Sequence, residues 1–483
     1  MSCLKITMIK PCYPLYLANK PQQPNADLAV VDKFTDEVAA HVALADKQIL
    51  DQAIAAAAEA ATPMRRLPSW QRKAMLKHLA ARCTERADEL AEVVVVEVGK
   101  PIQYARAEVT RLIATVELAA EESTRLGGEL IPLDDTQRGV GYRAMWQRVP
   151  IGPCAFITPW NFPLNLVAHK IAPAIACGCP FVLKPASFTP ISALILGEIL
   201  AETDLPEGAF SILPMKSSDS AALVEDERIR KLSFTGSPEV GWKLRDQAHK
   251  KAVTLELGGN AAVVIDRDTD IADAVERCVF GGYYQAGQSC ISVQRILVHR
   301  EIYDAFREAF VASVRAIKTG DPRNEQTVVG PIISEEDAKR IEQAIKNAVE
   351  QGGNLLCGGG RKGRMVEPAV LENVPHDAEA SCEEIFGPVT LIEPFDEFDD
   401  ALATVNDSKY GLQAGVFTRD IVRIQKAWDE LNVGGVLINE IPSWRADQMP
   451  YGGSKDSGLG REGVRWAIES MTEPRLLVIR TPK

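Results

Sequence analysis

Two side chains with complementary chemistry lie near the middle of the sequence. Cys290 ends the segment 287–290 (GQSC), and Glu256 begins the upstream segment 256–259 (ELGG). A cysteine thiolate can attack a carbonyl carbon to form a covalent intermediate, and a carboxylate can activate water as a general base. The pair is therefore suited to forming a thioester and then hydrolysing it. Taken alone, Cys290 would be interpreted as a buried structural thiol and Glu256 as a strand-end cap or ion-pair partner.

Three further motifs accompany this pair in a fixed order. They are residues 159–163 (PWNFP), 234–237 (FTGS) and 383–388 (EEIFGP). Together the five motifs resemble the NAD(P)-dependent aldehyde dehydrogenase superfamily, from about residue 45 to the C-terminus. The resemblance is to its non-acylating members, because acylating relatives generally lack a base at the position of Glu256.

The resemblance implies a reaction and three catalytic residues. An aldehyde would be oxidised to a carboxylic acid with NAD(P)+, through a thiohemiacetal and then a thioester on Cys290. Glu256 would activate the water that hydrolyses the thioester. Asn161, together with the backbone N–H of Cys290, would stabilise the oxyanion, although an asparagine in this setting can also be a turn amide.

The pattern of apolar residues predicts an α/β fold. Residues 47–123 have helical spacing, with Pro68 and Pro101 as breaks. Short buried strands then alternate with helices over 152–257 and again over 261–439, which predicts two parallel sheets covered by helices. The resemblance implies the aldehyde dehydrogenase fold, with two Rossmann-like parallel-sheet domains and a small β oligomerisation arm.

We expect the following division of the chain. Residues 1–131 and 151–257 form the cofactor-binding domain, residues 258–448 form the catalytic domain, and residues 132–150 and 466–483 form the oligomerisation arm and tail. Residues 139–149 and the apolar run 476–479 are typical of exposed strands that need a partner edge. In the family such segments pair between subunits, so we expect a homodimer or homotetramer.

A phosphate site is predicted at residues 232–241. A strand ends at Phe234 and a helix starts near Ser237, where free N–H groups and the Ser237 hydroxyl can receive a pyrophosphate. A merely well-capped helix explains this segment equally well. Two literal G-x-G-x-x-G matches, at 358–363 and 458–463, lack the strand before and helix after that the dinucleotide motif requires, so we predict structural roles for both.

The resemblance assigns further residues to the coenzyme. Lys184 and Ser187 would meet the adenosine ribose; many NAD-preferring relatives carry Glu at the second position, where it repels a 2′-phosphate. We therefore expect NADP+ to be at least tolerated. Lys216 can bind that phosphate or simply be solvated, and Phe386 taken alone would be a core residue. The full predicted set is Ile157, Pro159, Trp160, Lys184, Ser187, Gly236, Ser237, Leu257, Glu384 and Phe386.

The predicted substrate end contains an arginine. The stretch 445–453 resembles the branch that handles lactaldehyde, phosphonoacetaldehyde or glyceraldehyde 3-phosphate without phosphorylation. The planar fork of Arg445 suits an anionic tail. Arg106 and Arg111 could assist, but ion pairing with Asp447 or Glu108 is the favoured interpretation for these two. The predicted substrate residues are Phe162, His169, Ser289, Ile291 and Arg445.

Composition narrows the class of protein. The 483 residues carry a net charge of −12, which argues against a nucleic-acid partner. No apolar stretch approaches the ~20 residues of a membrane span, and no secretion signal is visible, so we expect a cytoplasmic protein. Ten cysteines and six histidines are scattered without ligand spacing, and we predict no metal site.

Two other classes of function were weighed. A cysteine hydrolase or esterase using Cys290 with a histidine would leave Lys184, Ser237 and Glu384 without a role. A catalytically silent binding protein on the same fold would be expected only if the nucleophile, base or oxyanion donor were missing.

Overall fold

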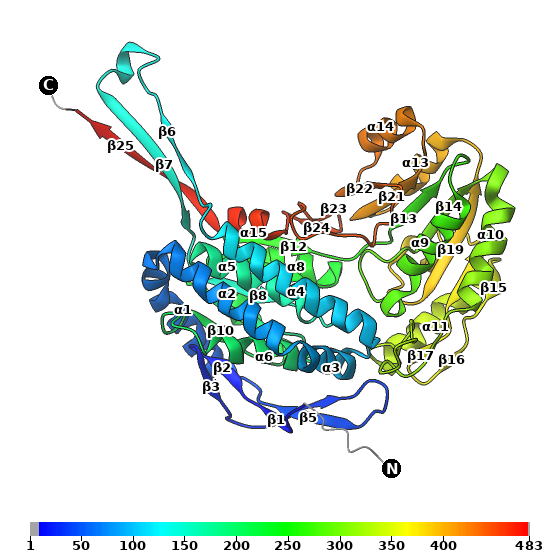
Figure 1. The fold of residues 1–483 in the computed structure, drawn as a ribbon, viewed down its shortest axis with the longest axis horizontal. Helices are drawn as coiled ribbons and strands as arrows, with labels where there is room; N and C mark the ends of the chain where they lie inside the picture. Colours follow the sequence, from blue (N-terminus) through cyan, green and yellow to red (C-terminus); the bar gives the residue numbers. More distant parts are fainter. Residues whose placement is uncertain (1–8, 482–483) are drawn as a thin grey trace.

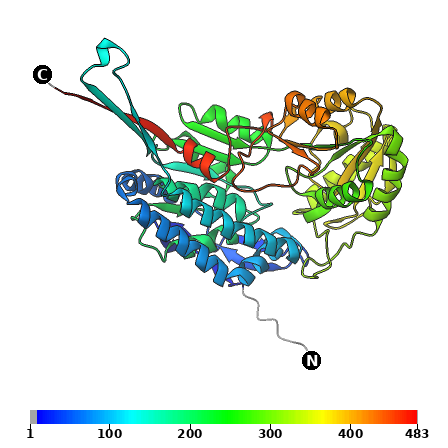
Figure 2. The same cartoon turned by 45° about the horizontal axis from the view of Figure 1, so that its top comes forward.

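A computed structural model describes residues 9–481, so the predicted ranges that begin at 1 or end at 483 extend beyond it. Two large β-sheets, each covered by helices, form the two lobes of the molecule, and a narrow three-stranded sheet projects from one of them (Figures 1 and 2). Parallel pairing dominates both large sheets. The predicted α/β class with two parallel sheets is confirmed.

The first sheet has eight strands in the order β24-β12-β11-β8-β9-β10-β2-β3. Its centre is parallel, and β24, β2 and β3 join antiparallel at its edges. The central strands are buried on both faces, as expected for short apolar runs between helices. The strands are β2 (Leu15–Leu17), β3 (Lys20–Gln22), β8 (Cys154–Ile157), β9 (Phe181–Lys184), β10 (Phe210–Ile212), β11 (Lys231–Thr235), β12 (Ala252–Glu256) and β24 (Gly458–Leu459).

Helices cover this first sheet. Asp46 caps the first of them by accepting a hydrogen bond from the backbone N–H of Ile49. Pro68 and Pro101 each precede a helix, as the predicted breaks require, and Pro190 and Pro238 each occupy a first helical turn. The helices are α1 (Lys47–Arg66), α2 (Ser69–Glu85), α3 (Ala87–Val98), α4 (Ile102–Glu122), α5 (Asn165–Cys177), α6 (Pro190–Leu200), α7 (Ala221–Glu225), α8 (Pro238–Gln247) and α15 (Val464–Ser470).

The second sheet has seven strands in the order β15-β18-β19-β14-β13-β21-β22, all parallel except β15. The strands are β13 (Ala262–Ile265), β14 (Arg295–His299), β15 (Asn354–Cys357), β18 (Ala369–Glu372), β19 (Val389–Phe395), β21 (Gln413–Phe417) and β22 (Gly435–Ile438). The helices of this lobe are α9 (Ile271–Tyr283), α10 (Arg300–Arg315), α11 (Glu335–Glu350), α12 (Glu379–Cys382), α13 (Phe398–Asn406) and α14 (Ile421–Glu430).

The projecting arm is an antiparallel sheet of β6 (Gly128–Ile131), β7 (Tyr142–Pro150) and β25 (Thr472–Arg480). Because β6 pairs with β7, the arm begins before residue 132, where the predicted boundary lay. At the other end α15 packs against α5 and also contacts β25, so residues 466–470 lie where the arm joins the body. The division of the chain into domains stays a prediction.

The segment before residue 47 contains strands that we did not predict. The strands β1 (Cys12–Tyr13), β5 (Val38–Val42) and β4 (Leu28–Val31) form a small sheet beside α3. The first literal glycine motif lies in a turn and a two-strand hairpin of β16 (Arg361–Lys362) and β17 (Met365–Val366), as expected for a surface turn. The second begins in β24, at the edge of the first sheet. No helix within residues 9–481 is long and apolar enough to cross a bilayer.

Candidate active site

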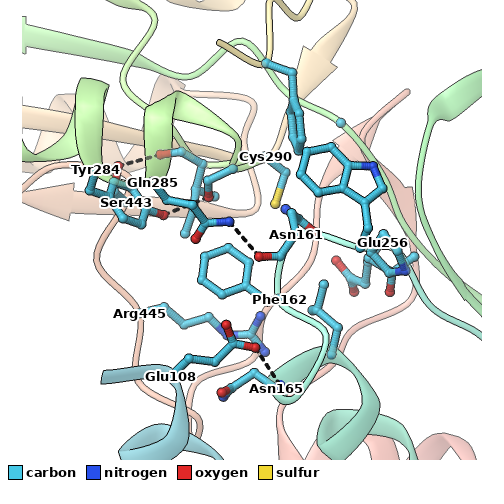
Figure 3. Close-up of a pocket in the computed structure, with 18 of the residues that line it drawn as sticks. Glu108, Asn161, Phe162, Asn165, Glu256, Tyr284, Gln285, Cys290, Ser443 and Arg445 are labelled. Atoms are coloured by element: carbon cyan, nitrogen blue, oxygen red, sulfur yellow. Dashed lines mark hydrogen bonds between the residues drawn. The ribbon is translucent and has the colours of Figure 1, made fainter. Parts of the chain in front are cut away.

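A cavity of about 560 Å³ is lined by residues of both lobes. From the first lobe it is lined by the loops that follow β8 and β11 and by the end of β12. Ligands of parallel α/β sheets bind beyond the carboxyl ends of the strands. From the second lobe the lining includes Tyr284, Cys290 and Arg445 (Figure 3). Glu384 also lines it. The fold therefore brings segments far apart in sequence to one enclosed space.

A turn of unusual backbone geometry carries Cys290 into this cavity. Gln285, Ala286 and Gly287 follow α9 with φ of 52°, 56° and 67°, all in the left-handed region. A side chain at Gly287 would place its Cβ 2.1 Å from the carbonyl oxygen of Gly387, so only glycine fits there. Left-handed non-glycine residues cost free energy and are concentrated at functional sites.

The sulfur of Cys290 has a hydrogen-bond partner in Tyr451. Its Sγ lies 3.2 Å from the hydroxyl of Tyr451. Burial raises the pKa of Cys290 to about 12, while the Tyr451 hydroxyl and the Arg445 charge act to lower it. The site thus favours the neutral thiol, and a thiolate there would depend on hydrogen bonding and nearby positive charge.

Asn161 lies beside Cys290 in the loop after β8 (Figure 3). Its backbone carbonyl accepts a hydrogen bond from Gln285 Nε2 at 2.5 Å, and its Nδ2 donates to the carbonyl of Gln288 at 3.1 Å. Both bonds join Asn161 to the turn that carries the cysteine. The second hydrogen of Nδ2 is left for a substrate oxygen, which is the geometry of an oxyanion donor.

Glu256 ends β12 on the opposite side of the cavity (Figure 3). It is 3% exposed, and neither carboxylate oxygen has a hydrogen-bond partner within residues 9–481. Burial and the nearby charge of Glu462 raise the pKa of Glu256 well above its usual value. Glu462 is itself bound by Lys170 Nζ at 2.6 Å. A carboxyl with a raised pKa is suited to accepting a proton near neutral pH.

Most of the predicted coenzyme residues line the same cavity. Trp160 and Phe386 meet edge to face with their ring centroids 5.5 Å apart. Glu384 accepts a hydrogen bond from the backbone N–H of Gly259 at 3.0 Å, and burial raises its pKa to about 7. The predicted residues in the lining are Pro159, Trp160, Gly236, Ser237, Leu257, Glu384 and Phe386.

The other three lie farther along the first sheet, outside the cavity lining. Ile157 and Lys184 are register partners at the carboxyl ends of β8 and β9. Lys184 is buried, and burial lowers its pKa. Ser187 follows on the surface. A lysine ammonium, an exposed hydroxyl and the N-terminus of α8 fit the ribose and phosphate groups of a dinucleotide.

All five predicted substrate residues line the cavity. The guanidinium of Arg445 stacks on the ring of Tyr451, 3.7 Å from its centroid, and its Nη2 lies 3.3 Å from His169 Nδ1. Burial lowers the pKa of His169 to about 4, and its Nε2 lies 3.0 Å from Asp447 Oδ1. His169 is therefore a neutral ring that donates to Asp447 and accepts from Arg445.

The two other arginines form ion pairs. Arg111 donates to Asp447 at 2.7 Å, which is the ion pairing favoured from the sequence, and it also lines the cavity. Arg106 pairs with Glu325 at 2.8 Å on the surface, not with Glu108. Arg445 lies 3.8 Å from Asp447, which Arg111 and His169 already occupy, and its Nε is buried without a hydrogen-bond partner within the described chain.

Several residues of the site were not found from the sequence. Glu108 forms a buried pair with Lys100 and accepts hydrogen bonds from the N–H groups of Leu164 and Asn165, which supports the loop carrying Asn161. Tyr451 and Glu462 lie close to Cys290 and Glu256, respectively. Tyr451 lies within the stretch 445–453, which the sequence did single out, but nothing local indicates its contact with a cysteine 161 positions away.

Comparisons with known proteins show which family the chain resembles. A family model described as the aldehyde dehydrogenase family matches residues 19–477. The chain is 39% identical to 3-sulfolactaldehyde dehydrogenase of Priestia megaterium (98% of this chain, 99% of the relative). It is 39% identical to lactaldehyde dehydrogenase of Methanococcus aeolicus (94% and 97%).

Two solved structures have the same fold. Aldehyde dehydrogenase 21 from Physcomitrella patens, in complex with its reaction product succinate, is 49% identical with a TM-score of 0.96 (98% of this chain, 99% of that chain). Glyceraldehyde-3-phosphate dehydrogenase GapN from Methanocaldococcus jannaschii, complexed with NADP, is 36% identical with a TM-score of 0.91 (95% and 100%).

Proposed function

The chain belongs to the aldehyde dehydrogenase family, with NAD(P)+ as coenzyme, and we propose that it oxidises a small aldehyde with an anionic tail to the carboxylic acid. The observation that carries the proposal is the position of Arg445. Its buried and incompletely paired guanidinium lines the cavity that also contains Cys290, Asn161 and Glu256. The same cavity would therefore both carry out the reaction and select the substrate.

In the first half of the reaction, Cys290 is the nucleophile. Its sulfur attacks the aldehyde carbon, and the carbonyl oxygen becomes an alkoxide that Asn161 Nδ2 and the backbone N–H of Cys290 stabilise. Losing one such donor typically lowers the rate ~10²–10³-fold. When bound, NAD(P)+ accepts the hydride that leaves the former aldehyde carbon, and a thioester on Cys290 remains.

In the second half of the reaction, Glu256 is the general base. Its unpaired carboxylate removes a proton from a water molecule, which attacks the thioester carbon and releases the carboxylic acid and the Cys290 sulfur. The absence of any hydrogen-bond partner within residues 9–481 for either oxygen supports this role. A carboxylate already engaged in a structural bond would be a weaker base.

Charge in the cavity supports an anionic tail. Asp447 balances Arg111, and Lys170 is paired with Glu462. Arg445 interacts with the charges of Asp447, Glu256 and Glu462, but within residues 9–481 it donates no hydrogen bond to a carboxylate. A buried charge is costly unless it is paired. Relatives handle a sulfonate-bearing aldehyde in one case and yield succinate in another. A carboxylate or sulfonate on a short chain is the substrate class that we infer.

Coenzyme choice is a separate proposal. Ser187 is exposed near Lys184 and places no negative charge against a 2′-phosphate, and the GapN relative was solved with NADP. We therefore propose that NADP+ is accepted as well as NAD+.

The hydrolase alternative is not favoured. No histidine within residues 9–481 hydrogen-bonds to Cys290, and His169, which lines the cavity, is already bound to Asp447 and Arg445. A silent binding protein is also not favoured, because Cys290, Asn161 and Glu256 line one cavity.

We also propose that the enzyme is a homodimer or homotetramer assembled through the arm. Leu476 and Val478 of β25 are 59% and 47% exposed, and Leu130 of β6 is 69% exposed. Apolar strands at an open sheet edge are ready to pair with another chain.

Substrate choice can be tested with succinic semialdehyde and butanal, which have the same chain length and differ in the terminal carboxylate. Arg445 also lies near Cys290, so Arg445→Leu should lower kcat/KM for both aldehydes. We expect the loss to be at least about tenfold larger for the anionic aldehyde, the loss of one charged hydrogen bond. Arg106→Leu is the matched control, because Arg106 lies outside the cavity lining, and it should change neither. Equal losses for both aldehydes in Arg445→Leu would contradict the proposal.

A further inference from the structure

The contact between Tyr451 and Cys290 has no part in the reaction described above. Tyr451 Oη lies 3.2 Å from Cys290 Sγ, and Tyr451 is 5% exposed. A hydroxyl at this distance can donate a hydrogen bond to sulfur. This hydrogen bond would be present before any substrate enters the cavity.

The surroundings of Tyr451 hold its hydroxyl in this direction. Its backbone forms a two-way bridge with Glu462, with N···O distances of 2.9 Å and 2.6 Å. Its ring packs with Ile291 and Leu412. The guanidinium of Arg445 also packs on the ring of Tyr451, 3.7 Å from its centroid, and is itself hydrogen-bonded to His169. The phenol therefore has little freedom to turn away from the sulfur.

The direction of the hydrogen bond follows from the chemistry of the two groups. Burial and the neighbouring Cys290 raise the pKa of Tyr451 well above its usual value, so the phenol keeps its proton. A thiolate has no proton to donate and accepts hydrogen bonds, and bonds to a charged acceptor are stronger than neutral ones. The cation against the ring withdraws electron density from the phenol, which makes its O–H a better donor.

We propose that Tyr451 is a positioning residue for Cys290: its hydroxyl donates to the sulfur, orients it in the cavity and stabilises the thiolate that attacks the aldehyde. This inference rests on the proposed role of Cys290 as nucleophile. When the thiol ionises, its proton passes to water and Tyr451 retains its own. Among the other charged groups that face the sulfur, Arg445 also favours the thiolate, whereas Glu384 and Glu256 oppose it.

The test is Tyr451→Phe, which keeps the ring against Arg445 and removes only the hydroxyl. Iodoacetamide alkylation of Cys290 is followed across a pH series, with and without NADP+, by mass spectrometry of the peptide containing residue 290. The ultraviolet absorbance of the thiolate is titrated in parallel, as the difference from the Cys290→Ser form of each protein. We expect alkylation about tenfold slower at neutral pH and both profiles displaced upward by about one pH unit, the size of one hydrogen bond to a charged group.

Tyr303→Phe is the matched control, because the Tyr303 hydroxyl donates to Glu372 in the second lobe, outside the cavity lining. It should leave both profiles unchanged. An unchanged or faster rate in Tyr451→Phe would overturn the proposal. Slower alkylation with an unchanged thiolate titration would also overturn it, because the hydroxyl would then affect only the access of iodoacetamide to the sulfur. Neither readout needs dehydrogenase activity, so a failure here is distinct from a failure of the proposed reaction.

Discussion

At the scale of single residues, Glu256 has an unusual environment. Buried polar atoms in proteins are nearly always hydrogen-bonded, yet both oxygens of Glu256 lack a partner within residues 9–481. An unpaired buried acid costs stability. The proposed role of Glu256 as the base for thioester hydrolysis would explain why the site contains such a group.

The raised pKa of Glu256 predicts the pH dependence of turnover. Hydrolysis needs the carboxylate form, and the pKa lies above the ordinary 4.5 because of burial and Glu462. As pH falls through this raised pKa the base becomes protonated, so kcat should fall at a pH above the ordinary carboxyl range. Steady-state kcat measured against pH, with an aldehyde at saturation, checks this. An acidic limb at the ordinary carboxyl pKa would contradict the raised value.

At the scale of elements, the turn before Cys290 has little tolerance for change. Gly287→Ala adds a Cβ that would lie 2.1 Å from the carbonyl oxygen of Gly387, at a φ of 67°. We expect a loss of more than about 2 kcal/mol in the free energy of unfolding, from the left-handed backbone and the clash together, and a large loss of kcat/KM. Denaturant unfolding and steady-state kinetics measure the two effects.

Gly363→Ala is the control for that substitution. Gly363 has a φ of 58° but nothing within 4 Å of the added Cβ. It should show only the backbone cost of about 1 kcal/mol and keep full activity. Similar behaviour of the two variants would mean that contact with Gly387 is unimportant.

Elements whose signals are local were predictable from the sequence. The strand at Cys154–Ile157 and the helix beginning at Pro238 were placed correctly, since apolar runs and a proline in the first turn are local features. The strands before residue 47 were missed. One of them, β2, joins the first sheet by pairing with β10, nearly two hundred residues away, and nothing local indicates that pairing.

The same distinction holds within the site. Cys290, Glu256 and Asn161 stand in recognisable motifs, and the structure brings all three to one cavity, although their roles stay predictions. The left-handed backbone of Gln285 and Ala286 has no glycine to indicate it. The contact of Tyr451 with Cys290 depends on how a loop beside the first sheet reaches the cavity, and no spacing rule describes that.

At the scale of the whole molecule, the cavity is built from one chain, whereas the arm extends away from it (Figure 1). Leu476 and Val478 lie two residues apart, so alternation along β25 places them on one face. Replacing both with lysine should shift the protein to a slower-sedimenting species in analytical ultracentrifugation. Arg475→Ala, on the same strand, is the control and should leave sedimentation unchanged. A double variant that sediments like the unmodified protein would exclude the arm as the interface.

The central claim is that one cysteine carries the substrate between oxidation and hydrolysis. The most direct measurement mixes Glu256→Gln with succinic semialdehyde and NADP+, quenches the reaction with acid and determines the mass of the peptide containing Cys290. The account predicts an acyl group on Cys290, formed together with one equivalent of reduced coenzyme per chain. An unmodified Cys290, with or without reduced coenzyme, would contradict it.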